Sequence, residues 1–208
     1  MSIAFIDKDP EVAAKEEEYY NRIELHRNNV YAAFQKLIKD PASEIIIFEK
    51  PVYLIADKIE PEIKNHDMSK FGDAEFYGYR MKWYPTLKEK NLLATSEEYR
   101  KEAEEANKLA CQHHMRNNDH HPQWWCIDND VEDYKIGDPS DMTIVAMLHM
   151  ICDWEGMSME VGGSTKQWWA NNKADKSRYM TENTVNFVDM IINQLPEIIY
   201  PKNNGNNN

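Results

Sequence analysis

The residues best suited to chemistry are seven histidines together with two aspartates, Asp67 and Asp153. The histidines stand at positions 26, 66, 113, 114, 120, 121 and 149. Imidazole and carboxylate groups together bind divalent metal ions such as Mn, Mg, Zn, Co or Fe. A bound metal lowers the pKa of water and neutralises charge on a phosphoryl group under attack. The pattern therefore predicts a metal site that could activate water.

His26 and Asp153 both fall on apolar helical patterns. His26 follows Ile23 by three residues and precedes Val30 by four, so its ring is expected to face the core. Taken alone, it is most simply a core histidine bonded to a backbone carbonyl. Asp153 must be paired, hydrogen-bonded or metal-bound to offset its desolvation, and His149, one turn earlier, is a candidate partner.

The stretch KNHDMSKFG places His66 and Asp67 side by side and Lys70 three residues later. The doublet is either a pair of metal ligands or two polar residues in a turn. Lys70 either supplies a cation for a substrate phosphate or is a solvated surface lysine. A single doublet arises easily by chance, so the interpretation depends on the ordered series of histidines and aspartates along the whole chain.

Two further pairs, His113 with His120 and His114 with His121, are each separated by seven residues, or two helical turns. Each pair shares a face if the helix continues that far, which Pro122 puts in question.

Helical periodicity dominates the elements that must position these residues. Helices are expected over residues 12–38, 51–67, 73–84, 95–118, 138–157 and 181–195. Their expected caps are Asp73, Thr95 or Ser96, Asp138 or Ser140, and Thr181. Pro61 should kink or divide the second helix, and residues 41–50 are expected to form a connector without a strand partner.

These elements predict an all-α helical bundle in one domain over residues 22–195. Residues 1–21 form a helical extension in this prediction, and residues 196–208 a disordered tail. The net charge of −12 argues against duplex nucleic acid as a partner. No apolar run is long enough to span a membrane, and the three unpatterned cysteines favour the cytoplasm.

The order of the motifs resembles the HD-domain superfamily of metal-dependent phosphohydrolases, which are all-helical. HDMSKF is close to the HD-x-G-K form of that superfamily, with Ser69 where glycine is common. HDMSKFGDAEFYGY, HHMRNNDHHPQWW and MICDWEGMS are similar to an often phage-encoded family, the domain of unknown function 5662. For a phage protein the expected location is the host cytoplasm.

The resemblance implies particular site residues. The metal ligands it implies are His26, His66, Asp67 and Asp153, with His114 and His121 preferred as ligands of a second ion. Asp67 and Lys70 are then catalytic, and Lys70 contacts the substrate phosphate. Asn117, Trp124 and Trp125 are candidates for substrate binding, although Asn117 can equally end a helix and the tryptophans can be packing residues.

The function implied is hydrolysis of a small phosphorylated molecule, in particular a nucleotide, by metal-activated water. One alternative is an HD-like di-iron oxygenase acting on a small molecule, which the extra histidines favour slightly. Another is a non-catalytic helical module that binds a protein through its acidic surface. The sequence leaves a homodimer open.

Overall fold

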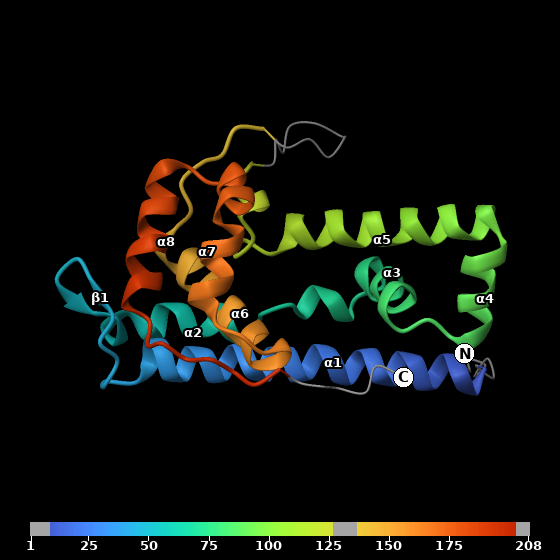
Figure 1. The fold of residues 1–208 in the computed structure, drawn as a ribbon, viewed down its shortest axis with the longest axis horizontal. Coiled ribbons are helices and arrows are strands. Elements are labelled where there is room, and N and C mark those ends of the chain that lie inside the picture. The colour runs from blue at the N-terminus through green and yellow to red at the C-terminus, as the bar shows by residue number, and fades with distance from the viewer. Residues whose placement is uncertain (1–8, 127–136, 203–208) are drawn as a thin grey trace, which may run out of the picture. The chain divides into compact units, whose positions relative to one another are not determined.

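The N-terminal helix α1 (Pro10–Phe34) extends over 25 residues with proline only at its first position (Figure 1). The computed structural model describes residues 9–126 and 137–202. A π-helix, η1 (Gln35–Lys39), continues α1. The predicted long helix over residues 12–38 is therefore confirmed.

Helices make up most of the described residues, so the all-α prediction is confirmed. The exception is an antiparallel pair of two-residue strands, β1 (Ile46–Ile47) and β2 (Lys50–Pro51), which corrects the prediction of a strandless connector. The side chain of Gln194 supports β1 by accepting from the backbone N of Ile46 at 2.8 Å and donating to its carbonyl at 3.2 Å. That support comes from a distant part of the chain, which local periodicity does not reveal.

The chain packs as two compact units, here called unit 1 and unit 2. Among the described residues, unit 1 combines residues 9–25 and 67–117, and unit 2 combines residues 26–66, 118–126 and 137–202. The boundary falls between His66 and Asp67, so the two members of the doublet belong to different units.

Unit 1 contains η3 (Met68–Phe71), α3 (Asp73–Trp83), α4 (Leu87–Thr95) and α5 (Glu97–Asn117). Helix α3 packs closely on α5 at Gly78, where a Cβ would lie 2.5 Å from the carbonyl oxygen of Ala106. Only glycine permits this approach.

The helix starts in unit 1 agree in part with the sequence. Ser96 caps α5 as one of the predicted alternatives, since its Oγ accepts from the backbone N of Tyr99 at 3.2 Å. Asp73 is the first residue of α3 rather than its cap, which is Gly72. Helix α4 was not predicted, although Thr86 and Glu89 form a capping box that the sequence contains.

Unit 2 contains α2 (Ala56–Lys64), α6 (Ile144–Val161), α7 (Thr165–Lys176) and α8 (Glu182–Gln194). Unit 2 also contains the short 3-10 helices η2 (Val52–Ile55), η4 (Pro122–Cys126) and η5 (Ser177–Tyr179). Pro61 lies inside a single helix α2, so it does not divide that element. No helix among residues 9–126 and 137–202 is both long and apolar enough to cross a bilayer.

The caps in unit 2 correct one prediction and confirm another. Helix α6 begins after Thr143, whose Oγ1 accepts from the backbone N of Ala146 at 3.2 Å, so neither Asp138 nor Ser140 is its cap. Thr181 caps α8 as predicted.

The core of unit 2 is built from apolar residues of its long helices. Fully buried side chains include Val30, Phe34, Ile59, Leu148 and Ile191. This packing fixes α6 beside the last part of α1 and beside α2.

The predicted disordered tail, residues 196–208, is described as far as residue 202. Tyr200 and Gly163 exchange backbone hydrogen bonds of 2.9 and 2.8 Å. The Tyr200 hydroxyl also donates to Glu155 at 2.7 Å. Residues 203–208 lie outside the described part, and the division into residues 1–21, 22–195 and 196–208 stays a prediction.

Candidate metal centre

Among the buried polar residues of helix α6 are His149, Asp153 and Glu160, which are 3%, 8% and 8% exposed as whole residues. They are separated by four and by seven residues, so they fall on one face of the helix. Most other positions of α6 are apolar, and burying polar groups there requires partners for each of them.

His26 of α1 lies against two of these groups. Its Nε2 is 3.0 Å from Oδ1 of Asp153, and its Nδ1 is 2.6 Å from Oε1 of Glu160. His26 is 7% exposed, so the ring is buried as the sequence predicted. Its partners are carboxylates of α6, however, rather than a backbone carbonyl.

His66 follows the C-terminal end of α2 and is 1% exposed. Its Nε2 lies 3.0 Å from Nε2 of His26 and 3.8 Å from Oδ1 of Asp153. Its Nδ1 lies 2.9 Å from Nε2 of His149. The guanidinium of Arg27 donates to the His66 carbonyl at 2.8 Å, which helps to hold this end of α2 in place.

His26, His66 and Asp153 form what we call the unit 2 centre, and their three ligand atoms suit a metal ion. The distances of 3.0, 3.0 and 3.8 Å define a triangle with a circumscribed radius of about 1.9 Å. A point about 2.0 to 2.2 Å from all three atoms therefore exists, which is the usual length of bonds from zinc to His nitrogen and carboxylate oxygen. Two nitrogens and one oxygen are also donors that divalent transition metals accept.

His120 extends this cluster of rings, and the sequence did not single it out as a preferred ligand. It is 1% exposed, and its ring centroid lies 4.6 Å from that of His66 and 4.3 Å from that of His149. His66, His120 and His149 also form a group with metal-ligating distances. His121, which was preferred, is partly exposed and stacks 4.2 Å from His120.

The end of α5 determines the backbone positions of His120 and His121. That helix stops at Asn117, and the backbone N of His121 bonds to the Asn118 carbonyl in a turn. The seven-residue spacing of His114 and His121 therefore does not place them on one helical face.

A second cluster, the unit 1 network, consists of Asp67, Lys70, Glu75, His113 and His114. Asp67 Oδ2 lies 2.5 Å from Lys70 Nζ, and Asp67 Oδ1 lies 3.4 Å from His114 Nε2. The carboxylate of Glu75 contacts Nδ1 of His113 at 2.7 Å and Nδ1 of His114 at 2.9 Å. Three predicted site residues, Asp67, Lys70 and His114, are thus brought together in unit 1.

Two members of this network are in unusual environments: Asp67 has a left-handed backbone conformation, and Glu75 is a buried charge. Asp67 has a φ of 56°, in the left-handed region that is uncommon for residues other than glycine and is tolerated by Asp. Glu75 is fully buried; burial raises its pKa, but the hydrogen bonds and charges of His114 and His113 hold the pKa below its ordinary value. Glu75 therefore carries its negative charge between the two imidazoles.

The predicted substrate-binding residues have other contacts. The Asn117 amide donates to the His113 carbonyl at 2.7 Å, which favours the interpretation that it ends α5. The Trp125 indole donates to the Asp119 carbonyl at 2.7 Å, and its ring lies 4.7 Å from that of Trp124. Both tryptophans are half-buried, which is compatible with packing and with stacking on a ligand.

Sequence reasoning missed Glu75 and Glu160. Glu160 could have been found from its spacing of seven residues after Asp153 on an apolar helix. Glu75 precedes Gly78 by one turn, and a glycine within a helix is a sign of close packing on that face.

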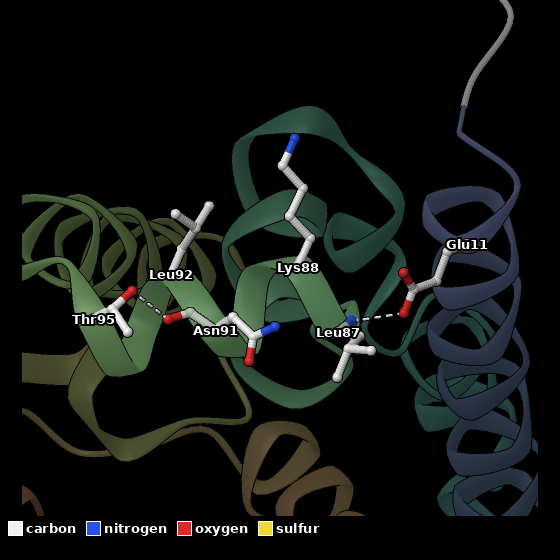
Figure 2. Close-up of a pocket in the computed structure, with 6 residues that line it drawn as sticks. All are labelled: Glu11, Leu87, Lys88, Asn91, Leu92 and Thr95. Carbon is white, nitrogen blue, oxygen red and sulfur yellow. Dashed lines mark hydrogen bonds between the residues drawn. The ribbon is translucent and has the colours of Figure 1, made fainter.

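A surface hollow of about 410 Å³ lies elsewhere in unit 1 (Figure 2). Its lining residues are Glu11, Leu87, Lys88, Asn91, Leu92 and Thr95. Glu11 accepts from the backbone N of Leu87 at 2.6 Å, so this carboxylate helps to hold the start of α4. None of the predicted site residues lines the hollow.

Comparison with known proteins gives one match. Residues 15–194 match the family described as Family of unknown function (DUF5662). No curated protein and no solved structure matches the chain. The chemistry must therefore be argued from the residues themselves.

Proposed function

The chain belongs to the DUF5662 family, and we propose that it is a metal-dependent phosphohydrolase acting on a nucleotide or another small phosphate ester. The observation that carries this proposal is the convergence of Nε2 of His26, Nε2 of His66 and Oδ1 of Asp153 in a buried part of unit 2. Their mutual distances suit a divalent ion, and all three residues were expected as ligands from the HD-like order of the sequence.

In this proposal the unit 2 centre holds the ion, which is Mn, Mg, Zn, Co or Fe. When bound, such an ion activates water for attack and neutralises charge on a phosphoryl group. The protein's own contribution is to orient the ligand rings and to exclude bulk water, which strengthens electrostatic interactions at the site.

The HD-like motif adds further roles, which rest on the sequence. It makes Asp67 another metal ligand and Lys70 the cation that receives the substrate phosphate. The Lys70 side chain is 24% exposed, so its ammonium is accessible to a ligand while it stays beside Asp67. His114 and His121 are then ligands of a second ion, and Trp124 or Trp125 stacks on a nucleobase.

The same motifs support two broader proposals. One is that the DUF5662 family is a branch of the HD superfamily, and the other is that this protein is phage-encoded and acts in the host cytoplasm. An experimental structure that cannot be superposed on HD domains would contradict the first. A chromosomal gene with no phage genes beside it would contradict the second.

Metal analysis of the purified protein, followed by phosphate release from a panel of nucleotides, tests the function. We expect a stoichiometric divalent metal and hydrolysis that is lost in His66→Ala and Asp67→Ala. A protein that binds no metal, and whose behaviour is unchanged in both variants, would contradict the proposal.

The alternative of an HD-like di-iron oxygenase is favoured by one observation, the grouping of four imidazoles from His26, His66, His120 and His149 in unit 2. Bound iron with a coloured oxidised state and oxygen consumption, without phosphate release, would favour this function. A native protein that holds no metal, together with a His66→Ala variant that unfolds, would instead support a non-catalytic helical module.

A further inference from the structure

We propose that Glu160 is the positioning residue of the metal centre and acts through His26. This inference rests on the proposed metal-binding function and concerns how the protein controls one ligand. Glu160 was not expected from the sequence, and its side chain is 3% exposed.

The first step concerns the proton on His26. Oε1 of Glu160 lies 2.6 Å from Nδ1 of His26, and an ionised carboxylate can only accept a hydrogen bond. Nδ1 therefore donates the hydrogen bond to Glu160. Nε2 is then the nitrogen that would give its lone pair to a metal ion held together with Asp153.

The second step concerns the direction of that lone pair. Nε2 of His26 points to Oδ1 of Asp153 and to Nε2 of His66, each at 3.0 Å. Glu160 and Asp153 are seven residues apart on α6, so one helix contacts both nitrogens of the ring. Glu160 thereby fixes the rotation of the ring as well as its tautomer.

The third step is a contrast with His66. Its Nδ1 faces an imidazole nitrogen of His149, which can either donate or accept, at 2.9 Å. His26 has a carboxylate as this outer partner. Carboxylate partners of this kind orient ligand histidines, and their loss commonly lowers metal affinity by about 10- to 100-fold.

Glu155 offers a matched control on the same helix. It is 4% exposed, and its carboxylate accepts from the hydroxyls of Thr165 at 2.5 Å and Tyr200 at 2.7 Å. A Glu155→Gln substitution thus removes a buried charge from α6 without changing a ligand's partner.

The experiment measures Zn²⁺ affinity by competition with a chromophoric chelator in the native protein, Glu160→Gln, Glu160→Asp and Glu155→Gln. We expect Glu160→Gln to weaken binding about 10- to 100-fold. We expect Glu160→Asp to recover part of the loss, and Glu155→Gln to bind within about twofold of the native protein. Circular dichroism establishes that each variant is folded.

A second readout does not depend on metal. Nitrogen-15 NMR of the metal-free protein should show a proton held on Nδ1 of His26 in the native protein and in Glu155→Gln, and a loss of this preference for Nδ1 in Glu160→Gln. Native-like affinity and an unchanged tautomer in folded Glu160→Gln would overturn the inference while the proposed function stands. A native protein that does not bind Zn²⁺ or any other divalent ion would overturn the proposed function, and the NMR result would still decide the role of Glu160.

Discussion

In unit 1 each clustered histidine faces a carboxylate, whereas in unit 2 the nitrogen atoms of several histidines face one another. Glu75 lies between His113 and His114, and Asp67 contacts Lys70. In unit 2, the nitrogens of His66 lie 3.0 Å from a nitrogen of His26 and 2.9 Å from a nitrogen of His149. In the unit 1 network an ammonium and two imidazoles surround the carboxylates, while converging imidazole nitrogens, as in unit 2, are an arrangement that a metal ion stabilises.

The comparison teaches that residue type alone does not identify a metal site. Both clusters combine histidines with buried carboxylates, yet their partners differ. Cations beside carboxylates indicate an ion network, and several ligand atoms around one point indicate a metal. The following predictions test this distinction, from the largest expected effect to the smallest.

The largest effect is expected from Asp153→Asn. This substitution removes the only carboxylate of the unit 2 centre, so metal affinity should fall by about 100-fold or more. Chelator competition measures the affinity. Asp189→Asn is the control because Asp189 also lies in unit 2 but bonds to Trp169 and Lys173. Equal affinities in the two variants would contradict the assignment of Asp153.

Asp67→Ala tests whether a member of the unit 1 network is also a metal ligand. Because the HD-like motif makes Asp67 a ligand, we expect metal loss of about 10- to 100-fold with little change in helical content. Circular dichroism and metal analysis measure both quantities. Asp67→Asn controls for the left-handed backbone, which Asn tolerates better than Ala. Full retention of metal would leave Asp67 as a member of the unit 1 network alone.

Alanine substitutions at two closely packed glycines, one in each unit, test whether packing in unit 2 controls metal binding while packing in unit 1 does not. A Cβ at Gly156 would lie 2.8 Å from Val30 Cγ2, and one at Gly78 would lie 2.8 Å from Ala110 Cβ. Each alanine variant should lose about 1 to 3 kcal/mol in free energy of unfolding through overpacking. Gly156→Ala should also weaken metal binding by about tenfold, because α1 and α6 carry His26 and Asp153.

Gly78→Ala should leave metal affinity unchanged, since it separates helices of unit 1. Urea unfolding and chelator competition on both variants check this pair. A metal affinity that falls equally in both would show that the two regions are not independent.

The smallest expected effect is the pH dependence of the stabilisation by Glu89 in unit 1. Its carboxylate accepts two hydrogen bonds from Arg80 at 2.5 and 2.8 Å. Burial raises the pKa of Glu89, but Arg80 and the backbone N of Thr86 hold it below its ordinary value of 4.5. The lowered pKa means that this stabilisation is present above pH 4.5 and is lost as the pH falls through the folded-state pKa.

Urea unfolding of the native protein and Glu89→Gln between pH 7 and pH 3 measures this effect. The difference in free energy of unfolding should be about 1 to 2 kcal/mol at pH 7 and should shrink below about pH 4.5. Arg80 is the cation bonded to Glu89, and burial together with the charge of Glu89 raises the pKa of Tyr99. A constant difference across this range would contradict the role of the ion pair.

Most helices could be predicted from the sequence because hydrophobic periodicity and capping residues are local features. The apolar period over α1 and α8 and the cap at Thr181 are properties of short stretches. Helix α7 was not predicted, and the burial of its Trp169, bonded to Asp189 of α8, is a tertiary contact. The small sheet depends in the same way on Gln194.

The sequence by itself determined the all-α class and the buried position of His26 and Asp153, because periodicity decides which side of a helix faces the core. Only the tertiary structure decided the partners: Glu160 for His26, His149 for His66, and Glu75 for His113 and His114. Those contacts join residues 38 to 134 positions apart. Packing of separate helices, rather than any local pattern, brings such atoms within hydrogen-bonding distance.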